Sequence, residues 1–170
     1  MKYENIIMNG DEEQVRFSLV KPGERQLVVL GVNPSRATDK RPDPTMTKVM
    51  GFAERNGFDG FVMLNLYPQR STALGGLHKE ADADLCRRNL QAIREAVAGM
   101  ESPTVLLAFG NAIGARPYLK ACLKDIVTLL APLHPQWKQI GQPTAYGNPR
   151  HPSRAGYTAF SDFDMERYLA

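Results

Sequence analysis

The sequence predicts an α/β domain, a three-layer α/β/α sandwich around a mainly parallel, roughly four-stranded sheet. Short runs of uninterrupted apolar residues alternate along the chain with longer segments whose apolar residues recur at helical spacing. A strand that is apolar on both faces is typical of a parallel sheet covered by helices on both sides. The length of 170 residues suits one hydrophobic core, so we expect a single domain over residues 1–170.

Two strands are expected near the start of the chain. Residues 14–20 alternate between apolar and polar side chains, with Val15, Phe17 and Leu19 on one face. A turn sequence at residues 21–24 leads into the apolar run at residues 27–30. The pattern predicts an edge strand followed by a buried strand.

A helix is expected next, between Thr45 as its N-cap and Gly57 as its end. Its apolar face consists of Met46, Val49, Met50 and Ala53. Further apolar runs at residues 61–64 and 105–109 predict two more buried strands. Together with the run at residues 27–30 these make three strands of the parallel sheet, and residues 137–140 predict the fourth.

Three more helices complete the expected fold. Helical spacing predicts one helix over residues 86–100 and another over residues 117–130. At the C-terminus, Ser161 and Asp164 fit a capping box for a short last helix.

Composition excludes several classes of protein. The 43% of hydrophobic and 23% of charged residues are ordinary for a globular domain and exclude disorder, collagen and coiled coil. No apolar run approaches the ~20 residues that a membrane span needs, and the N-terminus does not resemble a secretion signal. Cys86 and Cys122 are too few for a disulfide scaffold or a four-thiolate metal site. We therefore expect a cytoplasmic protein with no membrane contact, no metal and no cofactor.

Polar residues gather where the predicted strands end. Ligands of open α/β sheets bind beyond the carboxyl ends of the parallel strands. The loops at these ends supply amide, hydroxyl, phenol and imidazole groups, on Asn33, Ser35, Asn65, Tyr67, His151 and Ser153. Three of these residues also have a specific structural interpretation. Asn33 before a proline can bond its own backbone, Asn65 can satisfy loop amides, and a lone histidine such as His151 often has a purely structural role.

The charge distribution favours the same edge of the sheet. The net charge of +3 is uninformative as a total, but residues 31–41, 65–80 and 147–158 together carry a net charge of +5. Phosphate contact would require such a layout, while a solvated basic rim is the alternative. The predicted phosphate-binding residues are Arg36, Arg70, Arg150 and Arg154.

Three of these segments, in this order, resemble motifs of the uracil-DNA glycosylase superfamily. The first is Gly31-Val32-Asn33-Pro34-Ser35, which resembles the first catalytic motif; the strand Val62-Met63-Leu64-Asn65 and the motif His151-Pro152-Ser153 follow. The resemblance implies a glycosylase-like fold and hydrolysis of an N-glycosidic bond. Asn33 would hold the attacking water, His151 would donate a hydrogen bond to the departing base, and Asn65 would match the pairing edge of that base. Tyr67 would offer a stacking surface.

A closer resemblance is to the family called domain of unknown function 1643, over about residues 27–153. Its pattern is met by Asn33-Pro34-Ser35 with Ala37, Asp43-Pro44-Thr45, Phe52-Ala53, Asn65-Leu66, Arg70, Gly110 and Gly147-x-Pro149-x-His151-Pro152.

The sequence also departs from the glycosylase pattern. The segment that supplies an apolar wedge in base-flipping glycosylases reads Arg154-Ala155-Gly156, and the first loop lacks the usual aromatic residue. A single-stranded substrate or a free nucleoside or nucleotide suits these losses. The alternatives are a non-catalytic module that binds nucleic acid or nucleotide and, from another class, a nucleotide-dependent transferase, although no phosphate loop is present.

Overall fold

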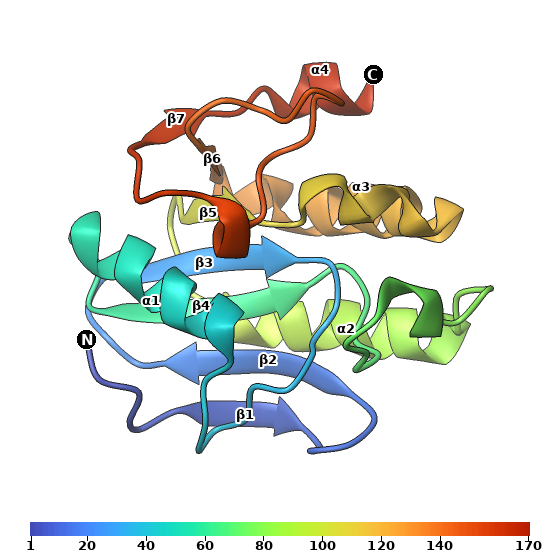
Figure 1. Cartoon of the computed structure of the whole chain (residues 1–170), viewed down its shortest axis with the longest axis horizontal. Helices are drawn as coiled ribbons and strands as arrows, with labels where there is room; N and C mark the ends of the chain where they lie inside the picture. The colour runs from blue at the N-terminus through green and yellow to red at the C-terminus, as the bar shows by residue number, and fades with distance from the viewer.

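A computed structural model describes all residues of the chain, 1–170. Its centre is a seven-stranded mixed sheet with the strand order β1-β2-β4-β3-β5-β6-β7 (Figure 1). The strands are β1 (Ile7–Gly10), β2 (Arg16–Lys21), β3 (Gln26–Gly31), β4 (Gly60–Asn65), β5 (Thr104–Leu107), β6 (Gln136–Ile140) and β7 (Phe160–Asp162).

The sheet is parallel at its centre and antiparallel toward both edges. Strands β4, β3, β5 and β6 run parallel, whereas β1 and β2 on one side and β7 on the other pair antiparallel. The prediction of a mainly parallel, roughly four-stranded sheet of the uracil-DNA glycosylase type is therefore wrong, although the α/β class is retained. The expectation of an edge strand at residues 14–20 is also wrong, because β1 pairs with the outer side of β2 and is itself the edge strand.

The unpredicted strands are short and lack a hydrophobic signal. Three of the four residues of β1 are exposed, and β7 has three residues, none of them buried. Such strands form by pairing with β2 and β6 and bury little apolar surface of their own. Neither a continuous apolar run nor a long alternation marks them in the sequence.

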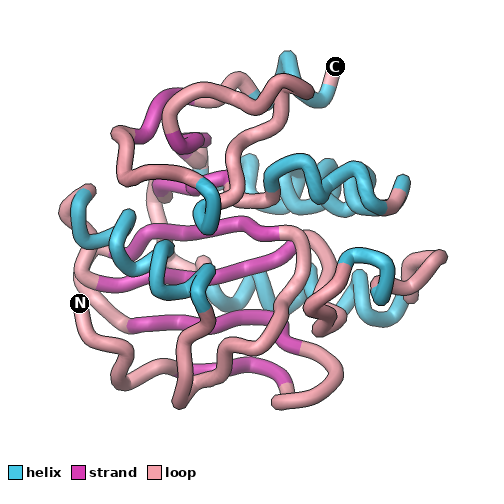
Figure 2. The backbone as a smooth tube through the Cα atoms, viewed as in Figure 1, coloured by secondary structure: helices cyan, strands magenta, loops and turns pink.

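Helices cover both faces of the sheet (Figures 1 and 2). Helix α1 (Pro44–Arg55) lies on one face, and α2 (Ala83–Ala96) and α3 (Pro117–Leu130) lie on the other. The remaining helices are short: α4 (Met165–Leu169) and the 3-10 turns η1 (Leu74–Gly76), η2 (Gly110–Ala115), η3 (Ala131–Leu133) and η4 (Pro152–Arg154). None of the helices combines the length and apolar composition that crossing a membrane requires.

Two helix starts differ from the expectation. Asp43, not Thr45, is the N-cap of α1, because its carboxylate accepts a hydrogen bond from the Met46 amide at 2.8 Å and Pro44 takes the first helical position. Asp164 alone caps α4, whereas Ser161 lies in β7.

Two hydrophobic clusters form the core, one on each side of the sheet. The larger cluster packs α2 and α3 against the sheet through residues such as Ile93 and Leu123, and the smaller packs α1 through residues such as Phe52. One buried polar side chain crosses the first interface: Asn89 of α2 donates from Nδ2 to the carbonyl oxygens of Asn65 (2.9 Å) and Leu66 (3.3 Å). Asn89 thus ties α2 to the carboxyl end of β4.

The variant Asn89→Ala tests this tie. Two buried carbonyl groups would lose their donor, so the free energy of unfolding should fall by about 1–3 kcal/mol. Gln91→Ala, at an exposed position of the same helix, is the control and should change it by less than about 0.5 kcal/mol. Urea denaturation followed by circular dichroism measures both values. Equal effects of the two substitutions would contradict a structural role for Asn89.

Candidate functional site

A cavity of about 390 Å³ opens at the carboxyl ends of the central strands, and we call it the strand-end pocket. Its lining includes Gly31, Asn65 and Ala108 at the ends of β3, β4 and β5, Asp43 at the start of α1, and His151 and Arg154 around η4. Of the residues predicted from the sequence, it brings together Asn33, Ser35, Asn65, His151 and Arg154. Loops far apart in the sequence therefore converge on one cavity.

Asn65 lines this pocket and carries a buried hydrogen-bond donor without a partner. The residue is only 1% exposed, and its side-chain nitrogen Nδ2 has no partner in the protein. A buried polar group without a partner is unfavourable, and a ligand acceptor would satisfy it. The amide also carries an acceptor, Oδ1, so Asn65 can both donate to a ligand and accept from it.

Two glycines let polar side chains approach the backbone closely. A Cβ atom at Gly31 would lie 2.8 Å from Oδ1 of Asn65, so a larger residue there would displace the amide. Gly110, at the start of η2, has a φ of +55°, and a Cβ atom there would lie 3.1 Å from Cβ of His151. The absence of side chains at both positions makes room for the two pocket residues.

Asn33 joins two loops by its amide nitrogen. Nδ2 donates to the carbonyl oxygens of Pro34, Gln69 and Ser71, at 3.0, 3.4 and 2.9 Å. These bonds occupy both N–H groups, in line with a structural role. They also fix the orientation of the amide, so that Oδ1 is the atom left to accept a hydrogen bond from a ligand or a water.

The hydrogen bonds of His151 define its tautomer. Its Nδ1 accepts from the backbone N–H of Ser153 at 3.1 Å and lies 2.7 Å from the Ser153 hydroxyl. A backbone N–H can only donate, so the proton of the neutral ring is on Nε2. Burial lowers the pKa of His151 below its usual value; the neighbouring Asp43 carboxylate raises this pKa and Arg154 lowers it. His151 therefore presents a neutral ring with an Nε2–H donor.

The pocket also contains Arg16, which sequence reasoning missed. Arg16 is 2% exposed and lies in β2, and its Nη1 donates to the carbonyl oxygen of Ala37 at 3.0 Å. Its Nε has no partner. Burial lowers the pKa of Arg16 to about 10, with the nearby Arg70 acting in the same direction and Asp43 opposing it.

A β-bulge explains why Arg16 faces the pocket. Between the pairs Asn9–Ser18 and Gly10–Arg16, β2 contains one extra residue, Phe17. Leu19 belongs to the cluster under α1, whereas Arg88 of α2 lies over the ring of Phe17, 5.1 Å from its centroid. The bulge thus breaks the simple alternation and turns Arg16 toward the α1 side.

Asp43 is the second pocket residue that the sequence analysis did not select. It is the one carboxylate in the lining, and one of its oxygens is already engaged as the cap of α1. Its position directly before Pro44 is the signal that could have identified the helix start, since proline is favoured at the first helical position.

The other predicted residues do not line the pocket. Tyr67 is fully buried, and its hydroxyl contacts Nδ1 of His78 and accepts from the Asp82 amide. Arg70 donates to the carbonyl oxygens of Asp11, Ser35 and Ala37 and so cross-links loops. 

The remaining three predicted residues lie at the surface. Ser153 holds the ring of His151, and Arg150 donates to the carbonyl oxygen of Gln142. Arg36 lines a separate cavity of about 550 Å³ with Lys40 and Arg41.

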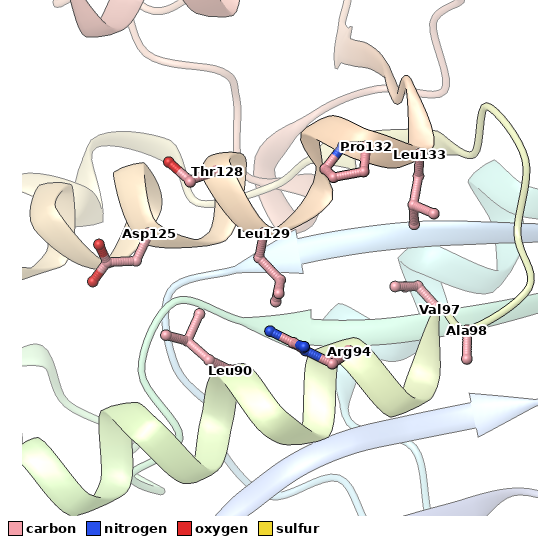
Figure 3. A pocket seen from close by; sticks show the side chains of 9 residues that line it. All are labelled: Leu90, Arg94, Val97, Ala98, Asp125, Thr128, Leu129, Pro132 and Leu133. Carbon is pink, nitrogen blue, oxygen red and sulfur yellow. The ribbon is translucent and has the colours of Figure 1, made fainter.

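A larger cavity of about 730 Å³ lies between α2 and α3 (Figure 3). Its lining is mainly apolar, with Leu90, Val97 and Leu129, and its charged residues are Arg94 and Asp125. The lining of this larger cavity contains no histidine, cysteine or unpaired buried amide. The strand-end pocket, which contains His151 and Asn65, is therefore the better candidate for a functional site. Nowhere does the structure group three or more histidine, cysteine, aspartate or glutamate side chains in a way that could hold a metal ion.

The state of His151 predicts a pH dependence of folding. The histidine pKa is lowered in the folded protein, while the unfolded chain titrates near its ordinary value of about 6.5. Below about 6.5 the unfolded chain therefore binds more protons, so this contribution to stability is lost as the pH falls and is fully present above it. The urea concentration at the unfolding midpoint should fall as the pH is lowered from about 8 to about 5. This fall should be smaller for His151→Gln than for the wild type. Identical declines would contradict a neutral, half-buried His151 ring in the folded protein.

Comparisons with known proteins give a family for the chain. A family model described as "Protein of unknown function (DUF1643)" matches residues 16–153. The matched segment contains the whole pocket lining except Arg154. Searches among curated proteins and among solved structures found no match. The resemblance to uracil-DNA glycosylase motifs is not tested by these comparisons and stays a prediction. Because the family model covers well over half of the chain, the protein belongs to the DUF1643 family of proteins of unknown function.

Proposed function

We propose that the strand-end pocket binds the base of a nucleoside or nucleotide and that the protein hydrolyses the N-glycosidic bond of this ligand. The observation that carries the proposal is the unpaired amide of the buried Asn65, in the same cavity as the Nε2–H donor of His151. An amide with one donor and one acceptor matches the pairing edge of a nucleobase, and His151 supplies a further donor for a base oxygen.

The size and apolar part of the lining fit a planar base. A volume of about 390 Å³ lies in the range of sites for small ligands. Val32, Met46, Met63 and Ala108 supply apolar surface next to the polar groups. Such a pocket combines apolar contact with a few polar groups that orient the ligand.

The reaction we propose is displacement of the base by water. Asn33 would orient the water through Oδ1, since its nitrogen is fixed by carbonyl groups. The water oxygen forms a bond to the sugar C1′ while the bond from C1′ to the base nitrogen breaks. The electron pair of the broken bond leaves with the base. Asp43, the carboxylate of the lining, accepts the proton of the water, because an amide is a poor base.

His151 would act on the departing base. Negative charge grows on the base as the glycosidic bond breaks, and a donor aimed at that charge stabilises the transition state more than the bound substrate. The neutral Nε2–H tautomer suits this role, because Ser153 holds the opposite ring nitrogen. The order of the motifs around Asn33, Asn65 and His151, which resembles that of uracil-DNA glycosylases, supports the same assignment.

A binding module without hydrolysis is the second candidate. The observation that favours it is the use of both N–H groups of Asn33 in joining loops, which gives this residue a role that needs no reaction. Arg36, Lys40 and Arg41, in the neighbouring cavity, would then contact phosphates outside the pocket.

Base release tests the proposal directly. The purified protein is incubated with free nucleosides and nucleotides, and with single- and double-stranded DNA containing uracil, hypoxanthine or thymine mismatches; released bases are separated by chromatography. We expect release from at least one substrate and a loss of about 10²–10³-fold in rate for His151→Gln, as for other transition-state donors. Asn65→Ala should weaken binding about tenfold or more.

Gln91→Ala is the control in this assay and should keep the wild-type rate. Binding that depends on Asn65, with no base released from any substrate, would favour the binding module. Base release that is unchanged in both His151→Gln and Asn65→Ala would contradict the proposed site.

A further inference from the structure

Arg16 is a buried charge without an ionic partner. No carboxylate lies within ion-pair distance of its guanidinium group. The side chain makes one hydrogen bond within the protein, from Nη1 to the Ala37 carbonyl oxygen. With 2% of its surface exposed and Nε unpartnered, it cannot be satisfied by bulk water in the way a surface arginine is. A buried charge of this kind is strongly unfavourable unless a counter-charge completes it.

The surroundings of Arg16 do not supply that counter-charge. Asp43 lines the same pocket, but its Oδ1 is held by the Met46 amide and it forms no ion pair with Arg16. A second cation, Arg154, also faces the pocket, and His151 is neutral. The lining therefore has one more positive than negative charge.

The fold places Arg16 in the pocket by an irregular feature. Strict alternation along β2 would put it on the same face as Ser18, and the extra residue Phe17 puts it on the face of Leu19 instead. Hydroxyl groups of Ser35, Thr45 and Thr72 line the same cavity and can donate to anionic oxygens. Bulges next to functional sites commonly re-aim one side chain in this way.

We propose that Arg16 forms an anion subsite within the strand-end pocket and that it binds the phosphate of a nucleoside monophosphate. This inference rests on the proposed function, since it names the substrate class of the same pocket. Arg16 is reached only through the pocket, because the rest of its surface is covered. A terminal phosphate can enter such a cavity, whereas the phosphates of a continuous strand lie along a backbone that has to pass outside it.

Calorimetric titration of the wild-type protein tests the substrate class without any substitution. The probes are a nucleoside, its 5′- and 3′-monophosphates, a single-stranded oligonucleotide of the same base, and inorganic phosphate. One of the monophosphates should bind about 10- to 100-fold more tightly than the nucleoside, as expected for a hydrogen-bonded charged pair. Equal affinities for the nucleoside and both monophosphates, or tighter binding of the oligonucleotide, would overturn the proposal.

Substitution of Arg16 assigns the effect to this residue. In Arg16→Met the preference for the monophosphate should disappear, while Arg16→Lys should keep part of it, because the charge remains but the paired donors are lost. Arg87→Met, at a position whose side chain is 72% exposed on α2, is the control and should keep the full preference. A monophosphate preference that persists in Arg16→Met would overturn the proposal.

The two proposals fail in distinguishable ways. If inorganic phosphate binds in a manner that requires Arg16 but no compound containing a base binds more tightly, the nucleobase function fails and the anion subsite stands. If a nucleoside binds in a manner that requires Asn65, and the monophosphate gains nothing, the anion subsite fails and the nucleobase function stands. The thermal midpoint provides a separate check, since inorganic phosphate should raise it in the wild type and not in Arg16→Met.

Discussion

The parallel pairing of β3 with β4 is the constraint on which the pocket depends. Its register sets Gly31 opposite Asn65, so the residue without a side chain stands where the amide needs space. The pairing continues beyond the strands, because Leu66 and Tyr67 donate from their backbone N–H groups to the carbonyl oxygens of Gly31 and Val32. The ends of both strands are thereby held together, and the loops that follow them start from fixed positions.

The two loops after these strands act as one structural unit. Asn33 and Arg70 donate to carbonyl groups across them, and the Ser71 amide donates to the Pro34 carbonyl. Polar side chains that look available for a ligand in the sequence are therefore partly used to hold the loops. Nδ2 of Asn65 is among the atoms that this internal bonding leaves without a partner.

The sequence predicts the centre of the fold because buried parallel strands are continuous apolar runs, as at residues 61–64. It also predicts that Asn33, Asn65 and His151 meet, since all three follow or face strand ends. It does not predict the position of Arg16 in the pocket, because the bulge in β2 depends on pairing with β1, which has no hydrophobic pattern of its own. The burial of Tyr67 is likewise set by tertiary packing and not by local sequence.

The short outer strands β1 and β7 have a consequence for contacts between molecules. A sheet that ended at the central parallel strands would expose long rows of unpaired backbone groups, to which another chain could add a strand. Here the sheet ends instead in strands of four and three residues, and an ion pair between Lys138 and Asp162 lies across the last pair. Few free backbone groups remain at either edge, and short edge strands of this kind disfavour the addition of a further strand to the sheet.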